Sequence, residues 1–218
     1  MVYVYVADIT CLPDPVDCPY VMEGLSENRR MKIMRCKQSL GRKQRLGAGL
    51  LLKEVLSAYG VQEKHIRIGE FGKPEAEGIC FSISHSHSKV VCATSCKPVG
   101  CDIEMVKEAP KGLAERFFLP QESKHIIGDE DFCRLWTMKE SYMKMTGEGM
   151  HLPLNQFEIR MDERIRVYHQ GKICSCNVKE YEIPEYRISV CSEELEFAPE
   201  IKLISLEKNT VFEKEAKI

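Results

Sequence analysis

Two carboxylates alternate with apolar residues in the segment VGCDIE, residues 99–104. Successive side chains of a strand point to opposite faces, so Asp102 and Glu104 would share one face of a strand. They would lie roughly 6.7 Å apart along it. Oxygen ligands at this spacing suit a hard cation such as Mg²⁺ or Mn²⁺. A solvated strand face that carries two acids is the simpler interpretation of this motif alone.

A second cluster of chemistry-bearing residues lies in RLWTMKESYMKM, residues 134–145. On a helix, Lys139, Glu140 and Lys144 fall on nearby faces, because residues three and four apart are neighbours. Glu140 is therefore a candidate third carboxylate for the same cation, and the two lysines are candidates to neutralise the negative charge of a bound phosphate. A surface ion pair between Glu140 and Lys144, worth about 0.2–0.5 kcal/mol, explains the same spacing without any ligand.

The segment FSISHSHS, residues 81–88, places His85 and His87 two positions apart. This spacing allows a metal-dependent hydrolase, but the further ligands of the zinc hydrolase motifs are missing. Ser84 lies outside a G-x-S-x-G elbow, and the chain has no P-loop or dinucleotide-binding glycine motif. We expect His85 to lie beside a bound phosphate, which favours the protonated imidazole, and His87 to be structural or solvent-facing.

Nine lysines and arginines, and no acid, lie between Arg29 and Lys53, although the whole chain has a net charge of only −2. The segment is either a solvated helical face or an anion-binding surface. A non-enzymatic anion-binding module is thus an alternative to an enzyme. A nucleic-acid binder would leave the carboxylates unexplained, and its affinity would fall steeply with salt.

The cysteine pattern and the N-terminus indicate the compartment. The chain has 11 cysteines, an odd number without any C-x-x-C pair, so most are expected to be reduced thiols packed as small apolar residues. The N-terminal segment MVYVYVADIT has no basic region, and no apolar stretch is long enough for a membrane span. We therefore expect a cytoplasmic protein with no membrane partner.

Hydrophobic periodicity predicts the elements that hold these residues. Strand patterns cover 2–9, 79–84, 90–95 and 99–104 and recur from 157 onward, helical patterns cover 47–59 and 112–146, and the charged tail 207–218 is expected to fray. Ser26 is a candidate helix N-cap and Pro120 suits a helix first turn. This order favours an α+β fold with mainly antiparallel sheets, divided near residue 105 into halves 1–105 and 106–218.

Taken together, five motifs resemble those of the 4'-phosphopantetheinyl transferases of the long, surfactin-synthetase-activating type. They occur in the family's order: FGKP, FSISHS, VGCDIE, RFF followed by Glu122, and LWTMKESYMK with GEG and LPL after it. The resemblance implies a pseudo-dimer of two similar α+β halves with the active site between them. It also implies transfer of the phosphopantetheine arm of coenzyme A to a serine of an apo acyl or peptidyl carrier protein, which releases adenosine 3',5'-bisphosphate.

The resemblance also implies roles for individual residues. Asp102, Glu104 and Glu140 match the carboxylates that hold Mg²⁺, with Mn²⁺ as an alternative ion. The implied catalytic residues are Glu140, Lys144 and Asp102. Glu140 matches the residue proposed to deprotonate the serine, directly or through a metal-bound water, and these two routes stay open. The implied coenzyme A contacts are Arg29, Lys32, Arg45, Lys73, Pro74, Ser84, His85, Lys139 and Lys144.

The carrier protein is expected to present an acidic helix to a basic rim of a monomeric enzyme. Phe117, Phe118 and Leu119 precede the catalytic helix and are candidates to flank that contact, although such residues in a helix are more often core. An ungapped alignment of GRKQRLGAG puts Gln44 where the family has arginine, so Arg45 or Arg42 is the candidate substitute.

Overall fold

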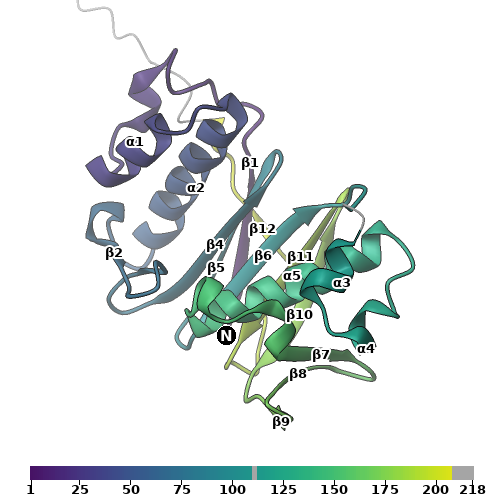
Figure 1. The fold of residues 1–218 in the computed structure, drawn as a ribbon. Helices are drawn as coiled ribbons and strands as arrows, with labels where there is room; N and C mark the ends of the chain where they lie inside the picture. The colour runs from purple at the N-terminus through teal and green to yellow at the C-terminus, as the bar shows by residue number, and fades with distance from the viewer. Residues whose placement is uncertain (110–111, 208–218) are drawn as a thin grey trace, which may run out of the picture.

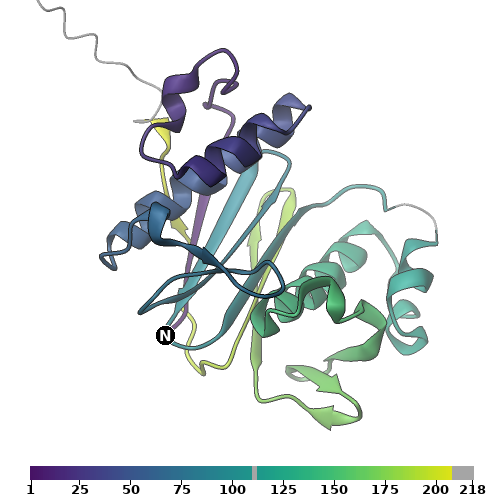
Figure 2. The same cartoon turned by 60° about the vertical axis from the view of Figure 1, so that its left-hand side comes forward.

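The computed structural model of the chain describes residues 1–109 and 112–207. Its strands form two main antiparallel sheets with helices on their outer faces (Figures 1 and 2). The first sheet has the order β12-β1-β5-β4 and the second the order β10-β11-β6. The strands of these sheets are β1 (Tyr3–Asp8), β4 (Cys80–Ser86), β5 (Lys89–Ser95), β6 (Val99–Met105), β10 (Asn177–Ile183), β11 (Tyr186–Ser192) and β12 (Lys202–Leu203). The helices are α1 (Glu27–Met34), α2 (Ser39–Ser57), α3 (Leu113–Phe117), α4 (Pro120–Ser123) and α5 (Asp129–Thr146).

Smaller elements complete the fold. The short hairpin of β2 (Arg67–Ile68) and β3 (Pro74–Glu75) follows α2, and a three-stranded sheet of β7 (Phe157–Met161), β8 (Ile165–His169) and β9 (Lys172–Ile173) follows α5. Single 3-10 turns lie between the larger elements, among them those at Gly149–His151 and Leu154–Gln156. None of the helices in the described ranges is long and apolar enough to cross a membrane.

The two main sheets bury apolar residues against each other, and each has a helix on its other face. In β5, Val91 and Ala93 join the cluster between the sheets, whereas Val90 and Cys92 join the cluster beneath α2. In β11, Val190 packs between the sheets and Cys191 packs on the side of α5. The period of two residues in a strand produces this alternation, because one face of each sheet meets the other sheet and one meets a helix.

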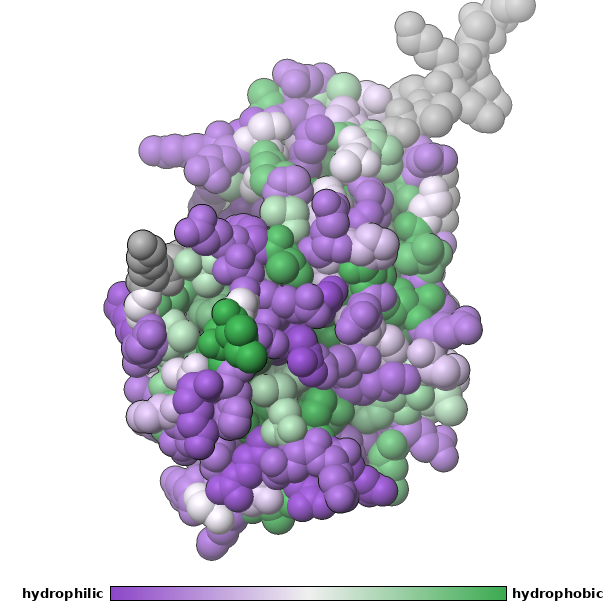
Figure 3. Space-filling model, turned by 90° about the vertical axis from the view of Figure 1, so that its right-hand side faces the viewer, coloured by the Kyte–Doolittle hydropathy of each residue, from purple (hydrophilic) through white to green (hydrophobic). Residues whose placement is uncertain are grey.

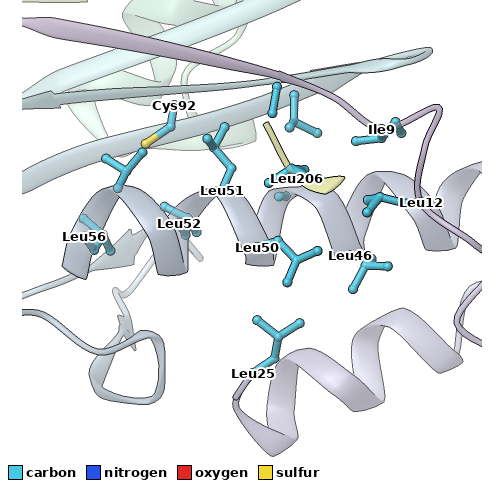
Figure 4. Packing of buried hydrophobic residues seen from close by; sticks show 14 of the residues in the cluster. Ile9, Leu12, Leu25, Leu46, Leu50, Leu51, Leu52, Leu56, Cys92 and Leu206 are labelled. Carbon is cyan, nitrogen blue, oxygen red and sulfur yellow. The ribbon is translucent and has the colours of Figure 1, made fainter. Parts of the chain in front are cut away.

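Helix α2 covers the first sheet with a row of leucines, which Figure 4 shows packed against Ile9, Leu12 and Cys92. Each fully buried leucine contributes about 1.5–3 kcal/mol of transfer free energy. The glycines of α2 allow close packing, because a Cβ on Gly47 would lie 2.3 Å from Cγ2 of Ile9. Ser26 is the N-cap of α1, as predicted, with its hydroxyl accepting from the amide of Arg29.

The α+β class with mainly antiparallel sheets is confirmed. Among the named strands of the described ranges, only β1 and β12 pair in parallel. The division at residue 105 stays a prediction. It falls at the end of β6, which pairs with β11 from the second half, while β12 pairs with β1 from the first.

Several predicted boundaries differ from the structure. Helix α2 begins at Ser39, earlier than the periodicity indicated, because the basic first turns carry few apolar residues. The predicted helical stretch 112–146 is broken into α3, α4 and α5, with Pro120 in the first turn of α4 as expected. Of the last predicted strand only β12 forms, and the tail from 208 to 218 lies outside the described residues.

Candidate active site

The two main sheets meet along β4 and β6. Between these two strands, serine hydroxyls of β4 take the place of backbone carbonyls as acceptors for backbone amides of β6. The backbone amide of Cys101 donates to Oγ of Ser82 at 3.0 Å. The amide of Met105 donates to Oγ of Ser86 at 3.1 Å. The alternating serines of FSISHS therefore all face β6, and they hold its carboxylates at a seam between the sheets. Of these serines only Ser84 was a predicted site residue, although the period-two spacing of the three serines in the sequence indicates that they share one face of the strand.

Asp102 is the centre of the seam. Its side chain is 4% exposed, and its Oδ1 accepts from Oγ of Ser84 at 2.6 Å and from Nζ of Lys144 at 2.6 Å. Nζ of Lys144 also donates to Oγ of Ser84 at 2.9 Å. Desolvation opposes the charged form of Lys144, but the neighbouring Asp102 carboxylate outweighs it and raises the pKa of the lysine. Oδ2 of Asp102 is buried and has no hydrogen-bond partner in the structure.

Glu104 and Glu140 flank Asp102 and are each partly buried. Desolvation and the charge of Asp102 raise the pKa of both carboxyl groups. Glu104 is fixed by Oγ of Ser86, which donates to its Oε2 at 2.7 Å. The three acids thus repel one another across a partly desolvated space, and a cation placed among them would remove that repulsion.

The donor set fits the hard cation that the sequence predicted, but the acids are not already arranged around a metal position. Among the described residues, no group of three or more histidines, cysteines or acids is close enough to hold an ion as it stands. The same finding applies to His85 and His87, so the hydrolase alternative has no ligand set either. What favours the carboxylates is that they are oxygen donors with coupled charges, and that Asp102 has a buried oxygen without a partner.

Gly100 allows α5 to lie directly on β6. A Cβ at this position would lie 1.9 Å from the carbonyl oxygen of Ser141 and 2.3 Å from the amide nitrogen of Met145. Helix α5 also packs on the neighbouring strand β11, where the buried hydroxyls of Thr137 on α5 and Ser189 on β11 hydrogen-bond at 2.8 Å. These contacts bring Glu140 and Lys144 of the helix beside the acids of β6. Sequence reasoning did not find Gly100, because its role depends on a helix forty residues later in the chain.

The FGKP turn closes the site next to the C-terminal end of α5. Nζ of Lys73 donates to the carbonyl oxygens of Val99 at 3.2 Å and Met145 at 3.1 Å. Burial lowers the pKa of Lys73. Lys73, Pro74 and Lys144 line one cleft of about 230 Å³. The structure therefore brings the predicted Lys73 and Pro74 to the site, with the ammonium of Lys73 already bonded to the backbone.

His85 lies on β4 within the field of two basic side chains. Desolvation, Lys144 and Arg45 lower its pKa, so an added anion would be needed to favour the protonated imidazole. Arg45 is exposed and donates to the carbonyl of Gly41. Gln44 instead donates to the carbonyl of His87, which sits in the β4–β5 turn at a left-handed φ of 48°. Of the neighbours Gln44 and Arg45, Arg45 is thus the one whose charge acts on a site residue, because it lowers the pKa of His85.

The predicted basic contacts in α1 have different surroundings. Nε of Arg29 donates to Oε1 of Glu63 at 2.5 Å, and Glu63 is 4% exposed. The other oxygen of Glu63 accepts from the amide of Ser26 at 2.6 Å, so this acid anchors the start of α1. Lys32 is exposed. Arg29 therefore has a structural partner, whereas Lys32 is open to an anion.

Lys139 differs most from its predicted role as a coenzyme A contact. Its side chain is 0% exposed, and Nζ lies 2.8 Å from Oε2 of Glu122. Nζ also donates to the carbonyl oxygens of Leu154 at 2.8 Å and Phe157 at 2.7 Å. A phosphate would reach this ammonium only if a buried ion pair broke. The role of Lys139 as a coenzyme A contact stays a prediction, and in this structure its ammonium is bonded to groups of the protein.

The aromatic residues before α5 belong largely to the core. Phe118 is 3% exposed and Phe117 and Leu119 are partly buried. The ring of Trp136 stacks on Phe132 at 5.7 Å and meets the edge of Phe117 at 5.8 Å. Of the three candidates to flank a carrier protein, Phe118 is thus a core residue, while the other two keep some exposed surface.

Comparison with known proteins identifies the class. A profile described as the 4'-phosphopantetheinyl transferase superfamily matches residues 98–191, which include the strand and the helix that carry the carboxylates. The 4'-phosphopantetheinyl transferase ffp of Bacillus subtilis is 35% identical over 202 residues, covering 86% of this chain and 90% of the relative. The chain therefore belongs to the 4'-phosphopantetheinyl transferase superfamily, and the expectation from its motifs is confirmed.

Its relatives narrow the class further. 4'-Phosphopantetheinyl transferase Sfp of Bacillus subtilis strain 168 is 32% identical over 86% of this chain and 90% of its own length. The crystal structure of Thermotoga maritima holo-[acyl-carrier-protein] synthase matches 44% of this chain and 61% of its own at 17% identity, with a TM-score of 0.38, a similarity too partial to add to the assignment. The chain is thus a phosphopantetheinyl transferase of the Sfp type.

Proposed function

We propose that this transferase uses Mg²⁺ and coenzyme A to load a serine of an apo acyl or peptidyl carrier protein, with adenosine 3',5'-bisphosphate as the second product. The observation that carries the proposal is the arrangement around Asp102. Its Oδ1 is held by Ser84 and Lys144, its buried Oδ2 has no partner, and two further carboxylates raise the local negative charge. Such a site suits a divalent cation and a pyrophosphate together.

Asp102, Glu104 and Glu140 are the residues that would hold the ion. Once bound, Mg²⁺ would supply positive charge to the pyrophosphate and polarise the phosphorus that is attacked. Lys144 stabilises the leaving phosphate oxygen, because its ammonium is fixed at the seam and its pKa is raised by Asp102. Glu140 would accept the proton of the carrier serine through a carboxylate oxygen that does not bind the ion, directly or through a water, because a carboxylate oxygen bound to a cation is a poor base.

The remaining residues orient the coenzyme. The turn of Lys73 and Pro74 provides a wall of the cleft that ends at Lys144. Arg45, whose charge acts on His85, and His85 itself offer positive charge or hydrogen-bond donors for the 3'-phosphate, and the exposed Lys32 is a further candidate for that contact. In this assignment Lys73 acts by holding the turn against β6 and α5, because its ammonium already donates to two carbonyls.

A carrier protein with an acidic helix would meet the basic side chains around α1 and the start of α2. A basic docking surface favours charge-steered, transient association, which is the form a modifying enzyme needs in order to release its product. The side of the molecule that carries α3 and α4, which Figure 3 faces, is also mainly hydrophilic, with small and separate apolar areas.

The test is a mass measurement on an apo carrier protein incubated with the enzyme, coenzyme A and Mg²⁺. We expect a gain of one phosphopantetheine group on the carrier serine, none on a serine-to-alanine carrier and none with a chelator present. Acyl and peptidyl carriers should be tried in parallel. Failure to modify any of them, with the enzyme folded, would overturn the proposal.

A further inference from the structure

The buried ammonium of Lys139 has a complete set of partners within the protein. It lies 2.8 Å from Oε2 of Glu122, donates to two backbone carbonyls, and sits 4.4 Å from the ring centre of Phe157. Burial lowers the pKa of Lys139, and the Glu122 carboxylate opposes this shift. Because a charge without partners would be very costly in such a place, these contacts must form together.

Glu122 is equally well satisfied, and its two oxygens connect separate segments. Oε2 accepts from the amide of Leu119 at 2.8 Å, and Oε1 accepts from the amide of Ile159 at 2.7 Å. Glu122 itself is 3% exposed. One carboxylate therefore ties the start of α4 to strand β7, and Lys139 ties both to the middle of α5.

This network affects the active site because of the position of Lys139 in the chain. It immediately precedes Glu140, and on a helix the next residue is turned by about 100°. If the Lys139 side chain is fixed on one side of α5, Glu140 must point away from it, toward Asp102 of β6. Gly100 and Thr137 fix the approach of the helix to the second sheet, and the lysine fixes its rotation from the opposite side.

We propose that Glu122 and Lys139 form a positioning pair, which sets the rotation of α5 and thereby holds Glu140 at the cation site. The pair touches neither substrate nor cation. It explains why an acid follows the RFF motif and why a lysine precedes Glu140, two features that the anion-binding residues leave unexplained. The inference rests on the proposed function, since it assigns Glu140 to the metal.

Removing one partner alone would leave a buried unpaired charge and endanger folding. The test therefore uses the double variant Glu122→Gln, Lys139→Met, which removes both charges and keeps side chains of similar size. Lys179→Met is the matched control. Nζ of Lys179 also donates to a carbonyl, that of Ala198 at 2.9 Å, and also lies over an aromatic ring, that of Tyr181 at 4.6 Å, but on β10.

For the double variant we expect a far-ultraviolet spectrum like that of the wild type, a kcat about tenfold to a hundredfold lower, and a KM for coenzyme A within about twofold. Calorimetric titration with Mg²⁺ in the presence of coenzyme A should show weaker binding by at least tenfold. Lys179→Met should match the wild type in all three measurements. A folded double variant with unchanged kcat and Mg²⁺ affinity would overturn the positioning role. A raised KM with unchanged kcat would instead return Lys139 to the coenzyme A contacts.

A second measurement needs no variant. Acetylating the folded wild-type enzyme and mapping the modified lysines should leave Lys139 unmodified with and without coenzyme A, whereas Lys144 should be modified and then protected by coenzyme A. Modification of Lys139 that coenzyme A prevents would refute the proposal. If the wild type transfers no phosphopantetheine, the proposed function fails, and the Mg²⁺ titrations of wild type and double variant still decide whether the pair positions Glu140.

Discussion

Gly100→Ala should damage the active site without touching any polar group in it. The added Cβ would lie 1.9 Å from the carbonyl oxygen of Ser141, whereas real Cβ contacts essentially never fall below 3.0 Å. The atoms in the way belong to the backbone of α5, so rotating a side chain cannot relieve the clash. The helix must move away from β6 by about 1.1 Å, the difference between the two distances.

This displacement acts on stability and on turnover by different routes. Overpacking in a close-packed interior costs about 1–3 kcal/mol, which for a chain of this size lowers the Tm by roughly 2–12 °C. A misplacement of about 1 Å in a catalytic group costs about a hundredfold in rate. Lys144 moves with the helix while Asp102 stays on β6, so their 2.6 Å contact lengthens. We expect kcat to fall by about two orders of magnitude.

The control is Gly128→Ala at the start of the same helix. Nothing lies within 4 Å of a Cβ at Gly128, and its φ of −147° suits any residue. This variant should keep turnover near that of the wild type and lose about 0.5–1 kcal/mol from the helix cap, because alanine is a poorer N-cap residue than glycine. Transfer kinetics and thermal unfolding of the two variants decide the matter. Wild-type kcat and Tm in Gly100→Ala would show that α5 does not depend on this close approach.

Three further changes separate charge effects from packing. Glu140→Gln should abolish turnover and raise the Tm in the absence of divalent cations, because it removes one of three mutually repelling carboxylates; an unchanged or lower Tm would contradict the repulsion. The hydrogen bond from Arg42 lowers the pKa of Asp14, so this pair stabilises the protein fully above the unfolded-state pKa of about 3.9, and its contribution is lost progressively as the pH falls toward the lower pKa of the folded state. Asp14→Asn should therefore lower the Tm by more at pH 7 than at pH 2, and equal losses at both would disprove the linkage. Lys32→Ala should raise the KM for coenzyme A at constant Tm, whereas Arg29→Ala should also lower the Tm by several degrees, because a buried acid loses its partner. Equal Tm values for both would reject the structural role of Arg29.

The predicted site residues that the structure brings together are those whose placement depends on local periodicity. Asp102 and Glu104 lie on one side of β6, because alternation in a strand is set by the backbone alone. Glu140 and Lys144 share a side of α5 for the same kind of reason, since they are four residues apart. No local sequence pattern showed that β6 packs against α5. The order of the family's motifs indicated that their residues share a site, and in the structure Gly100 allows the contact between β6 and α5.

The predicted coenzyme A contacts that have acidic partners in the structure are charged groups whose partners lie far away in the sequence. Lys139 meets Glu122, 17 positions earlier, and Arg29 meets Glu63, 34 positions later. A basic residue looks the same in sequence whether it faces solvent, a phosphate or a buried acid. Only the tertiary fold decides among these, because ion pairing over such separations depends on how the elements pack.

The net charge of the active site depends on which of its carboxylates have a basic side chain as a partner. Among the described residues, Lys144 pairs with one oxygen of Asp102 and the other oxygen has no donor, while Glu104 and Glu140 have no basic partner as close. A fully paired site would bind a cation weakly, because each acid would first have to give up its partner. A site with no lysine would repel the pyrophosphate. One lysine among three carboxylates gives an excess of negative charge for a divalent ion and keeps a positive charge for the phosphate that follows it.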